Sequence, residues 1–223
     1  MSLRYCILLV LLCGVTAGPV RADGPIPAAP SDPPQDPRLG TCTHFAFFGR
    51  GWENYQAILP LVRQAGLTWI RDDFPWADVE KSKGIYRIPD RYMRWIKAAH
   101  QNHLKLILIL NYGNNLYPDH YDPEAYAKFA AEMARQLKDD VDCLEILNEP
   151  ANFGYSKAYG GRWNGMEEDG SVSPWVGKYV TLCNKAAVAI KAANPKMKVI
   201  GLGSVAPVNF RQLEMGINSN VDG

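Results

Sequence analysis

Short apolar runs alternate with amphipathic segments along the greater part of the chain. Mainly apolar runs of strand length lie at residues 43–49, 67–71, 104–110, 143–147 and 198–202. Because these runs are apolar at nearly every position, they predict strands that are covered on both faces. Between them, apolar residues recur at helical spacing. This spacing predicts helices over residues 53–65, 89–102, 122–138, 174–193 and 209–217.

Residues that favour helix ends mark several of these limits. Pro89 and Pro174 stand at predicted helix starts, and Gly66 follows the end of the first predicted helix. Asp122 precedes the helix over 122–138 and is the expected N-cap, because its carboxylate can accept hydrogen bonds from the free N–H groups of the first turn.

Strands that alternate with helices predict a parallel sheet with right-handed crossovers. Two α/β architectures satisfy this pattern, a doubly wound sheet and a (β/α)8 barrel. No G-x-G-x-x-G follows the first apolar run, which weakens the case for a dinucleotide-binding sheet. The longest loops follow the second and fourth runs, at the carboxyl ends of the strands. Barrel enzymes build their active sites at that end.

The first 40 residues have a different pattern. Arg4 precedes an apolar run over residues 5–15, and Ala22 ends a stretch that suits cleavage. Residues 1–22 are therefore predicted to be a signal peptide, and the mature protein to be secreted or periplasmic. A membrane anchor is the alternative, but the run is shorter than the roughly 20 residues of a spanning helix. Six prolines between residues 25 and 37 predict an extended Pro-rich linker over 23–40.

Composition and charge narrow the class of protein. The chain has 223 residues, of which 47% are hydrophobic and 21% charged, with a formal net charge of +1. These values are typical of a globular domain with its own core, here predicted over residues 41–223. The balanced charge argues against nucleic acid as a partner. No later apolar stretch is long enough to span a membrane.

Three cysteines follow the predicted signal peptide: Cys42, Cys143 and Cys183. One disulfide could form in an oxidising compartment. Three buried, apolar thiols are the favoured interpretation. The chain contains neither a C-x-x-C nor an H-E-x-x-H spacing, so no metal or other cofactor is predicted.

Candidate chemistry lies where the fourth predicted strand ends, at Asn148, Glu149 and Pro150. A carboxylate at the end of a buried strand is unfavourable without a role or a partner. Partial burial would raise the pKa of Glu149, as a general acid requires. The Asn148 amide can donate and accept hydrogen bonds with a substrate hydroxyl. On spacing alone, a strand that simply ends in polar residues before a loop is equally favoured.

The sequence Ile-Leu-Asn-Glu-Pro that ends at Pro150 resembles the signature of a large clan of retaining glycoside hydrolases. This clan is built on (β/α)8 barrels and includes cellulase-like and β-xylosidase- or iduronidase-like families. Residues 66–76 resemble the second strand of these enzymes, residues 76–86 the loop after it, and residues 110–117 the end of their third strand. The resemblance extends over residues 42–223.

The resemblance implies an α/β fold, a TIM (β/α)8 barrel of which the chain holds about five βα units. It implies an exported glycosidase that hydrolyses O-glycosidic bonds of an oligo- or polysaccharide by retaining double displacement, without a cofactor. Glu149 would be the acid/base, and Asn148 would hold the hydroxyl next to the reacting carbon. Arg71 would lie below the site. The alternative for Arg71 is a structural ion pair with Glu145, because strand alternation directs Glu145 and Glu149 to the barrel interior.

Further candidate substrate contacts lie on the loops after the strands. Aromatic faces can bind sugar rings, although ordinary packing is the alternative for each of them. The aromatic candidates are Trp76, Tyr112, Tyr117, Phe153 and Trp163. The polar candidates on the loop after the third strand are Asn114 and His120.

In the resembling families the nucleophilic glutamate lies on the seventh strand, and residues 1–223 contain no counterpart to it. Retaining hydrolysis needs two carboxylates about 5 Å apart. The favoured expectation is therefore the N-terminal portion of a longer enzyme, inactive as the 223-residue chain alone. The alternatives are a partial barrel completed by another chain or by dimerisation, a carbohydrate-binding remnant without catalysis, and an unrelated binding module.

Overall fold

The computed structural model describes residues 34–47, 54–152, 154–218 and 220–223. They belong to one compact unit, Ser31–Gly223. The predicted signal peptide and residues 23–33 of the predicted linker lie outside the described residues.

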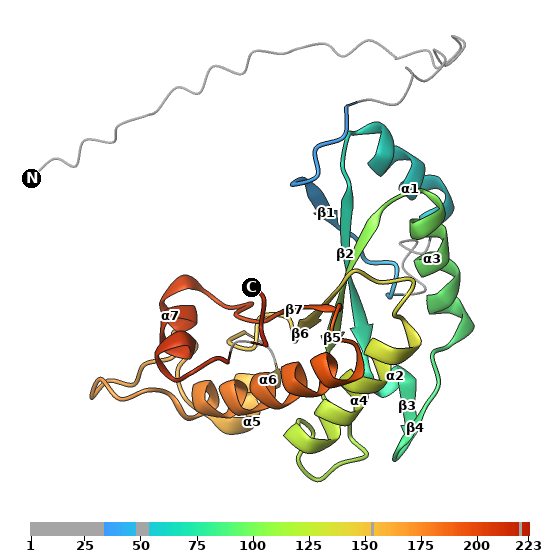
Figure 1. The fold of residues 1–223 in the computed structure, drawn as a ribbon. Coiled ribbons are helices and arrows are strands. Elements are labelled where there is room, and N and C mark those ends of the chain that lie inside the picture. Colours follow the sequence, from blue (N-terminus) through green and yellow to red (C-terminus); the bar gives the residue numbers. More distant parts are fainter. Residues whose placement is uncertain (1–33, 48–53, 153, 219) are drawn as a thin grey trace, which may run out of the picture. The chain divides into compact units, whose positions relative to one another are not determined.

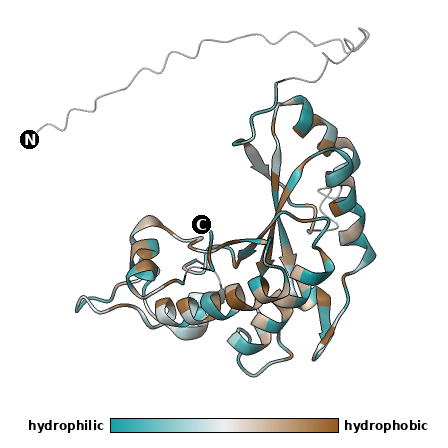
Figure 2. Cartoon of the chain, in the orientation of Figure 1, coloured by the Kyte–Doolittle hydropathy of each residue, from teal (hydrophilic) through white to brown (hydrophobic). Residues whose placement is uncertain are grey.

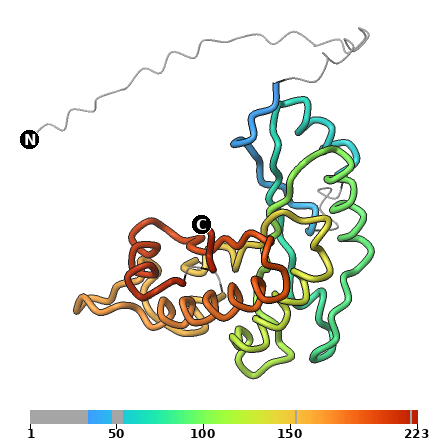
Figure 3. The backbone as a smooth tube through the Cα atoms, viewed as in Figure 1, coloured from blue at the N-terminus to red at the C-terminus, as the bar shows by residue number. Residues whose placement is uncertain are grey.

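Five parallel strands form one sheet in chain order (Figure 1). The strands are β1 (Gly40–Cys42), β2 (Trp69–Pro75), β5 (Lys105–Asn111), β6 (Cys143–Ile146) and β7 (Lys198–Ile200). Each pairs with the next strand along the chain, so the colour in Figure 3 runs steadily from blue to red across the sheet. A doubly wound sheet would change direction at a switch point. The observed order is therefore that of a (β/α)8 barrel, although over the described residues the sheet does not close.

The helices that connect the strands lie on one side of this sheet (Figure 1). They are α1 (Tyr55–Gln64), α3 (Asp90–Gln101), α4 (Pro123–Gln136) and α6 (Pro174–Ala193), and α7 (Ala206–Glu214) follows β7 and packs against α6. All five confirm predicted helices, with bounds that agree to within three residues. The Asp122 carboxylate accepts a hydrogen bond from the Ala125 N–H at 2.8 Å, which confirms the predicted N-cap. We call the opposite, helix-free side the inner face.

Apolar side chains fill the layer between the sheet and its helices. Figure 2 shows hydrophobic residues along the strands and hydrophilic residues on the outer sides of the helices. Phe74, Leu106 and Leu144 of the strands are fully buried, as are Trp95 of α3 and Tyr179 of α6. Full burial of one such side chain stabilises the fold by about 1.5–3 kcal/mol. This layer fixes the sheet that carries the candidate residues.

The first strand lies earlier than predicted. It spans Gly40–Cys42, whereas the apolar pattern predicted residues 43–49, of which 48 and 49 lie outside the described part. The buried Asp72 carboxylate explains the difference. It accepts hydrogen bonds from the Thr43 hydroxyl (2.6 Å) and from the backbone N–H groups of Phe45 (2.7 Å) and Ala46 (3.2 Å). These bonds bend the chain, so Phe45 is buried by a turn and not by a strand.

Asp72 should also make stability depend on pH. Burial raises the pKa of Asp72 to about 6 in spite of its hydrogen bonds. The folded chain therefore holds this proton more tightly than the unfolded chain does. The contribution of Asp72 to the free energy of unfolding should fall by about 1–3 kcal/mol as pH rises from about 4 to about 6. Urea unfolding of the wild type and of Asp72→Asn across this range measures it. The variant should lack that part of the slope, and an identical slope in both proteins would contradict the prediction.

The second strand is longer than predicted, and four short elements were not predicted. β2 continues through Asp72 and Asp73 to Pro75, whereas the apolar run ended at Arg71. The loop after β2 contains α2 (Trp76–Val79) and an antiparallel hairpin of β3 (Glu80–Ser82) and β4 (Ile85–Tyr86). The loop after β6 contains α5 (Gly154–Tyr159). The polar residues Asp72 and Asp73 interrupt the apolar pattern of β2, so the pattern ends before the strand does.

Segments at both ends of the compact unit pack against the sheet. In the described part of the predicted linker, the Asp36 N–H donates to the Gly66 carbonyl at 3.2 Å, and Pro37 O accepts from the Trp69 indole at 2.9 Å. Beside β7, the Asp222 N–H donates to Val199 O, and Gly201 N–H donates to Gly223 O, both at 2.8 Å. Residues 222–223 thus lie along the β7 edge, where a next strand would pair.

The cysteines divide into two kinds. Cys143 and Cys183 are buried, as predicted, and burial raises the pKa of each thiol to about 12. The prediction for Cys42 is wrong, because this thiol is exposed on the inner face beside Arg71. All three are free thiols. Across the described residues, no helix has the length and apolar character that crossing a membrane requires.

Candidate active site

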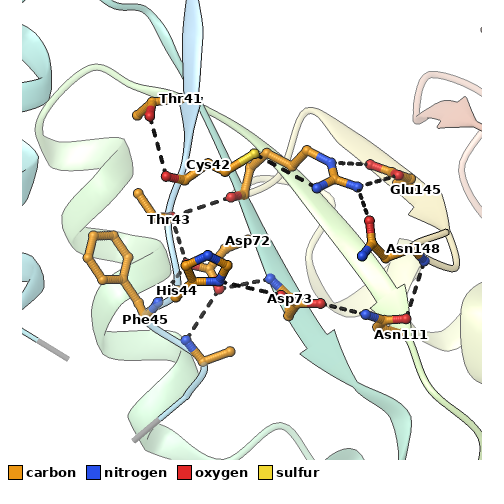
Figure 4. A network of polar contacts seen from close by, with 12 residues as sticks. Thr41, Cys42, Thr43, His44, Phe45, Asp72, Asp73, Asn111, Glu145 and Asn148 are labelled. Carbon is orange, nitrogen blue, oxygen red and sulfur yellow. Dashed lines mark hydrogen bonds and ion pairs between the residues drawn. The ribbon is translucent and has the colours of Figure 1, made fainter. Parts of the chain in front are cut away.

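Polar side chains of four neighbouring strands meet on the inner face of the sheet (Figure 4). Alternation along β2 separates Asp72, which faces the turn after β1, from Arg71 and Asp73 on either side of it. The parallel register aligns Asp73 with Ile109 of β5 and Glu145 of β6. The carboxyl ends of the strands therefore bring residues from distant parts of the sequence into one cluster.

Arg71 forms the inner part of this cluster. Its Nε and Nη2 donate to the two carboxylate oxygens of Glu145, each at 2.6 Å. Nη2 also donates to Oδ1 of Asn148 at 2.8 Å. The Glu145 side chain is 6% exposed, and its carboxylate raises the pKa of Arg71 further above its ordinary value. The predicted alternative for Arg71, an ion pair with Glu145, is therefore present, and the same guanidinium orients Asn148.

Asn111, the last residue of β5, connects the other residues of the cluster. Its Nδ2 donates to Oδ1 of Asp73 at 2.5 Å. Its Oδ1 accepts from the backbone N–H groups of Tyr112 (2.9 Å) and Asn148 (3.2 Å). His44 lies at the edge of the cluster, with Nδ1 3.9 Å from Oδ2 of Asp73. Asn111 and Asp73 were not among the predicted site residues, although both stand near the carboxyl ends of strands, where barrel sites are built.

Glu149 lies at the outer end of the cluster and is exposed, whereas partial burial was predicted. The strand ends at Ile146, and Leu147 and Glu149 have φ values of 58° and 41°. The alternation that directs Glu145 inward therefore does not extend to Glu149. Oε2 of Glu149 accepts a hydrogen bond from Nδ2 of Asn152 at 3.0 Å, and Oε1 has no partner in the described chain.

Asn148 and Glu149 line a small recess together with Tyr112, Tyr121 and Tyr155. Tyr112 is 39% exposed, and it is the one predicted aromatic platform that lies in this recess among the described residues. Arg71 donates to Oδ1 of Asn148, and the Asn148 backbone N–H donates to Asn111, whereas Nδ2 of Asn148 has no hydrogen-bond partner within the described chain. A free amide donor beside an exposed carboxylate can bind a hydroxyl and exchange a proton with a neighbouring oxygen.

Three other predicted substrate contacts bind the buried residue Glu80, away from this recess, two through its carboxylate and one through its backbone carbonyl. Trp76 is fully buried and donates from Nε1 to Oε2 of Glu80 at 2.5 Å. The Tyr117 hydroxyl donates to Oε1 of Glu80 at 2.6 Å, and Nδ2 of Asn114, also buried, donates to Glu80 O at 3.0 Å. The Trp76 and Tyr117 rings stack with centroids 5.3 Å apart. In this structure Trp76 is therefore a core residue and offers no face to a sugar.

The remaining candidates are not part of the recess. His120 is exposed on the loop after β5, and its backbone carbonyl accepts from the Asn114 N–H at 2.8 Å. Trp163 is 60% exposed on the loop before α6. Phe153 lies outside the described residues. Within the described ranges, no group of three or more His, Cys, Asp or Glu side chains is placed to hold a metal ion.

Replacing Tyr117 with Phe distinguishes a structural role from a sugar platform. The variant removes a hydrogen bond to the buried Glu80 carboxylate, so the free energy of unfolding should fall by about 1.5–3 kcal/mol. Oligosaccharide affinity should stay unchanged, because Tyr117 lies outside the recess. Denaturant unfolding and calorimetric titration measure the two quantities. Weaker sugar binding with unchanged stability would favour the platform instead.

Solved structures that are similar to this chain include glycoside hydrolases of the (β/α)8 clan. A family 39 glycoside hydrolase from the gut symbiont Bacteroides cellulosilyticus WH2 has a TM-score of 0.61 and 21% identity over 82% of this chain and 36% of its own. An exo-β-1,4-mannosidase from Opitutaceae bacterium strain TAV5 has a TM-score of 0.54 and 18% identity over 74% of this chain and 32% of its own. An endocellulase from Pyrococcus horikoshii has a TM-score of 0.52 and 15% identity over 73% of this chain and 50% of its own.

These similarities confirm the fold predicted from the sequence. The chain spans between about a third and a half of the length of these three structures. At this low identity the likeness is one of fold. No protein-family model matches the chain, and no curated protein does.

Proposed function

We propose that this chain carries the acid/base part of an exported glycoside hydrolase that cleaves O-glycosidic bonds with retention of configuration. The proposal depends mainly on one observation: the exposed Glu149 carboxylate and the free amide nitrogen of Asn148 belong to adjacent residues that line one recess at the carboxyl end of a barrel-type sheet. The glycosidase neighbours support an oligo- or polysaccharide as the substrate. The predicted signal peptide supports export.

In the proposed reaction a second carboxylate attacks the sugar carbon and forms the glycosyl–enzyme bond, while Glu149 donates its proton to the glycosidic oxygen and the bond between that oxygen and the sugar carbon breaks. The leaving sugar departs as an alcohol, and Glu149 is left as a carboxylate. It then takes a proton from water, whose oxygen attacks the glycosyl–enzyme intermediate and releases the sugar. The Asn148 amide holds the hydroxyl next to the reacting carbon. Because Arg71 fixes Oδ1 of Asn148, the Nδ2 donor faces away from the ion pair.

The proposed mechanism requires a second carboxylate about 5 Å from Glu149 as the nucleophile. Glu145 is ill-suited to this role because both its oxygens accept from Arg71. Asp73 accepts from Asn111 and lies deeper in the cluster. We therefore propose that the nucleophile comes from outside the described residues, on a continuation of this chain or on a second polypeptide.

The open inner face favours a second candidate, a carbohydrate-binding protein without turnover. Tyr112 and the free Asn148 amide could hold a sugar without any further residue. This candidate includes a partial barrel completed by a partner. It predicts sugar affinity and no hydrolysis by the isolated chain.

Intact mass and product analysis of the native protein, purified from its source, test the proposal together. We expect a mature mass that includes further βα units or a bound partner, and hydrolysis of aryl glycosides from a panel of xylosides, mannosides and glucosides. NMR should show that the first product has the anomeric configuration of the substrate. Inverted product would overturn the retaining mechanism. Sugar binding without hydrolysis by a chain that ends at Gly223 would replace the enzyme with the binding protein.

A further inference from the structure

Two residues of the cluster, Asn111 and Asp73, take no part in the proposed reaction. Asn111 is 3% exposed and Asp73 is 7% exposed, so both act inside the protein. The Asn111 side chain connects β2, through Asp73, with the backbone N–H of Asn148, which follows β6. One amide thus joins three neighbouring strand ends (Figure 4).

The contacts determine the orientation of this amide. The Asp73 carboxylate accepts its hydrogen bond from Nδ2 of Asn111, the donor end of the amide. Oδ1 is then left facing two donors, the N–H groups of Tyr112 and Asn148. With the amide turned over, oxygen would face the carboxylate and nitrogen would face the two N–H groups. All three hydrogen bonds would be lost, and Asp73 therefore holds the productive orientation.

The segments that Asn111 holds have unusual backbone conformations. Tyr112, Leu147 and Glu149 have φ values of 64°, 58° and 41°, a region that residues other than glycine rarely adopt. Such conformations persist where the surroundings hold them. The N–H of Asn148 lies between two of these residues and the N–H of Tyr112 belongs to the third. The amide of Asn111 is thus bound to both strained strand ends.

We propose that Asp73 and Asn111 form a positioning pair that sets the backbone of Asn148 and Glu149, so that the Glu149 carboxylate faces the bond to be cleaved. The inference rests on the proposed function, since it assigns Glu149 as the acid/base. Two anchors then converge on Asn148. Arg71 holds its side chain and Asn111 holds its backbone. Neither Asp73 nor Asn111 needs to touch the substrate.

A residue exchange within the pair tests this role. In Asn111→Asp, two carboxylates face each other and the donor to Asp73 is lost. In the double variant Asp73→Asn/Asn111→Asp, the new Asn donates to the new Asp, whose second oxygen can still accept from Tyr112 and Asn148. We expect kcat of native-length Asn111→Asp to fall roughly 10²-fold, as displaced catalytic groups do, with KM changed less. The double variant should recover most of kcat.

The matched control is Asn184→Ala. Asn184 also bridges two segments, donating to Gly216 O and accepting from the Asn218 N–H, both at 2.9 Å, on the helix side of the fold. Asn184→Ala should lower the free energy of unfolding and leave both kcat and KM unchanged. The backbone amide resonances of Tyr112 and Asn148 give a readout that needs no turnover. They should move in Asn111→Asp, return in the double variant and stay in place in Asn184→Ala.

The outcomes separate the positioning role from the proposed function. If Glu149→Gln lowers turnover while Asn111→Asp keeps full kcat, the positioning role is wrong and the glycosidase stands. Failure of the double variant to restore kcat, with both proteins folded, would likewise overturn the pairing. If Glu149→Gln leaves turnover unchanged, the proposed acid/base is wrong, whatever the amide resonances show.

Discussion

Arg71→Met is expected to lower the free energy of unfolding by about 3–5 kcal/mol, the cost of leaving a buried charge without its partner. Both oxygens of Glu145 accept from Arg71, and the Glu145 side chain is 6% exposed. Without the guanidinium, this carboxylate would face the inner side of the sheet with neither a cation nor a donor. Urea unfolding, with the denaturant dependence of the wild type as a check on two-state behaviour, measures the change.

The double variant Arg71→Met/Glu145→Met is the control for this prediction. Removing both charges removes the unpaired carboxylate as well, and apolar replacement of a buried ion pair is often neutral. Most of the lost stability should therefore return. Sugar binding should be weakened in both variants, because in each of them Oδ1 of Asn148 lacks its donor from Arg71. A loss below about 1 kcal/mol in Arg71→Met would show that the pair behaves like an exposed one.

The fold could be predicted from the sequence wherever a local pattern determines the structure. Helix α6 begins and ends at the predicted residues, because Pro174 opens an uninterrupted apolar face. Strand β1 could not be predicted in the same way. The turn that displaces it depends on the Asp72 carboxylate, whose acceptor role is visible only once β2 and the turn are adjacent. A hydrophobic pattern predicts that Phe45 is buried, but it does not distinguish a strand from a turn at that position.

In the candidate site, too, local patterns predicted some features, and contacts between distant residues determine the others. Strand alternation predicted that Glu145 faces inward, where Arg71 could pair with it, and the Arg71 side chain makes that contact across β5, although the register aligns Glu145 with Asp73. The prediction that Glu149 is partly buried was wrong, because the backbone leaves the strand conformation after Ile146 and the side chain is exposed. Asn111 could not be selected, since an asparagine at a strand end has no distinctive spacing. Its role depends on two partners, 37 and 38 residues away along the chain.

The aromatic candidates illustrate a further limit of prediction from residue type. A sequence cannot tell an aromatic ring that faces a ligand from one that packs beneath a loop. Trp76 and Tyr117 both contact Glu80, a buried carboxylate that the sequence did not mark. The hydrogen bonds of Asn114 and Tyr117 to Glu80 link the loop after β5 to the loop after β2. These aromatics therefore stabilise the loops of the carboxyl end, and Tyr112 remains the exposed ring beside Glu149.

Glu149→Gln in the native protein is expected to lower turnover by about 10²–10⁴-fold on substrates with poorly activated leaving groups, the usual contribution of a general acid. Glutamine keeps the size of the side chain and can still accept from Asn152, so the fold should not change. Substrates with dinitrophenolate leaving groups need no proton and should form the glycosyl intermediate at nearly the wild-type rate. The effect should therefore depend on the leaving group, which a general loss of folded protein cannot reproduce.

The pH profile and a matched carboxylate complete this test. Loss of the Glu149 proton should define the alkaline limb of the rate in the wild type, so Glu149→Gln should remove or shift that limb. Glu168→Gln is the control, because Glu168 lies on the same loop, is 89% exposed and contacts Arg162 away from the recess. It should keep the wild-type rate and profile. Wild-type turnover in Glu149→Gln, or an alkaline limb that the substitution leaves in place, would exclude Glu149 as the acid. A carboxylate outside the described residues would then have to supply the proton.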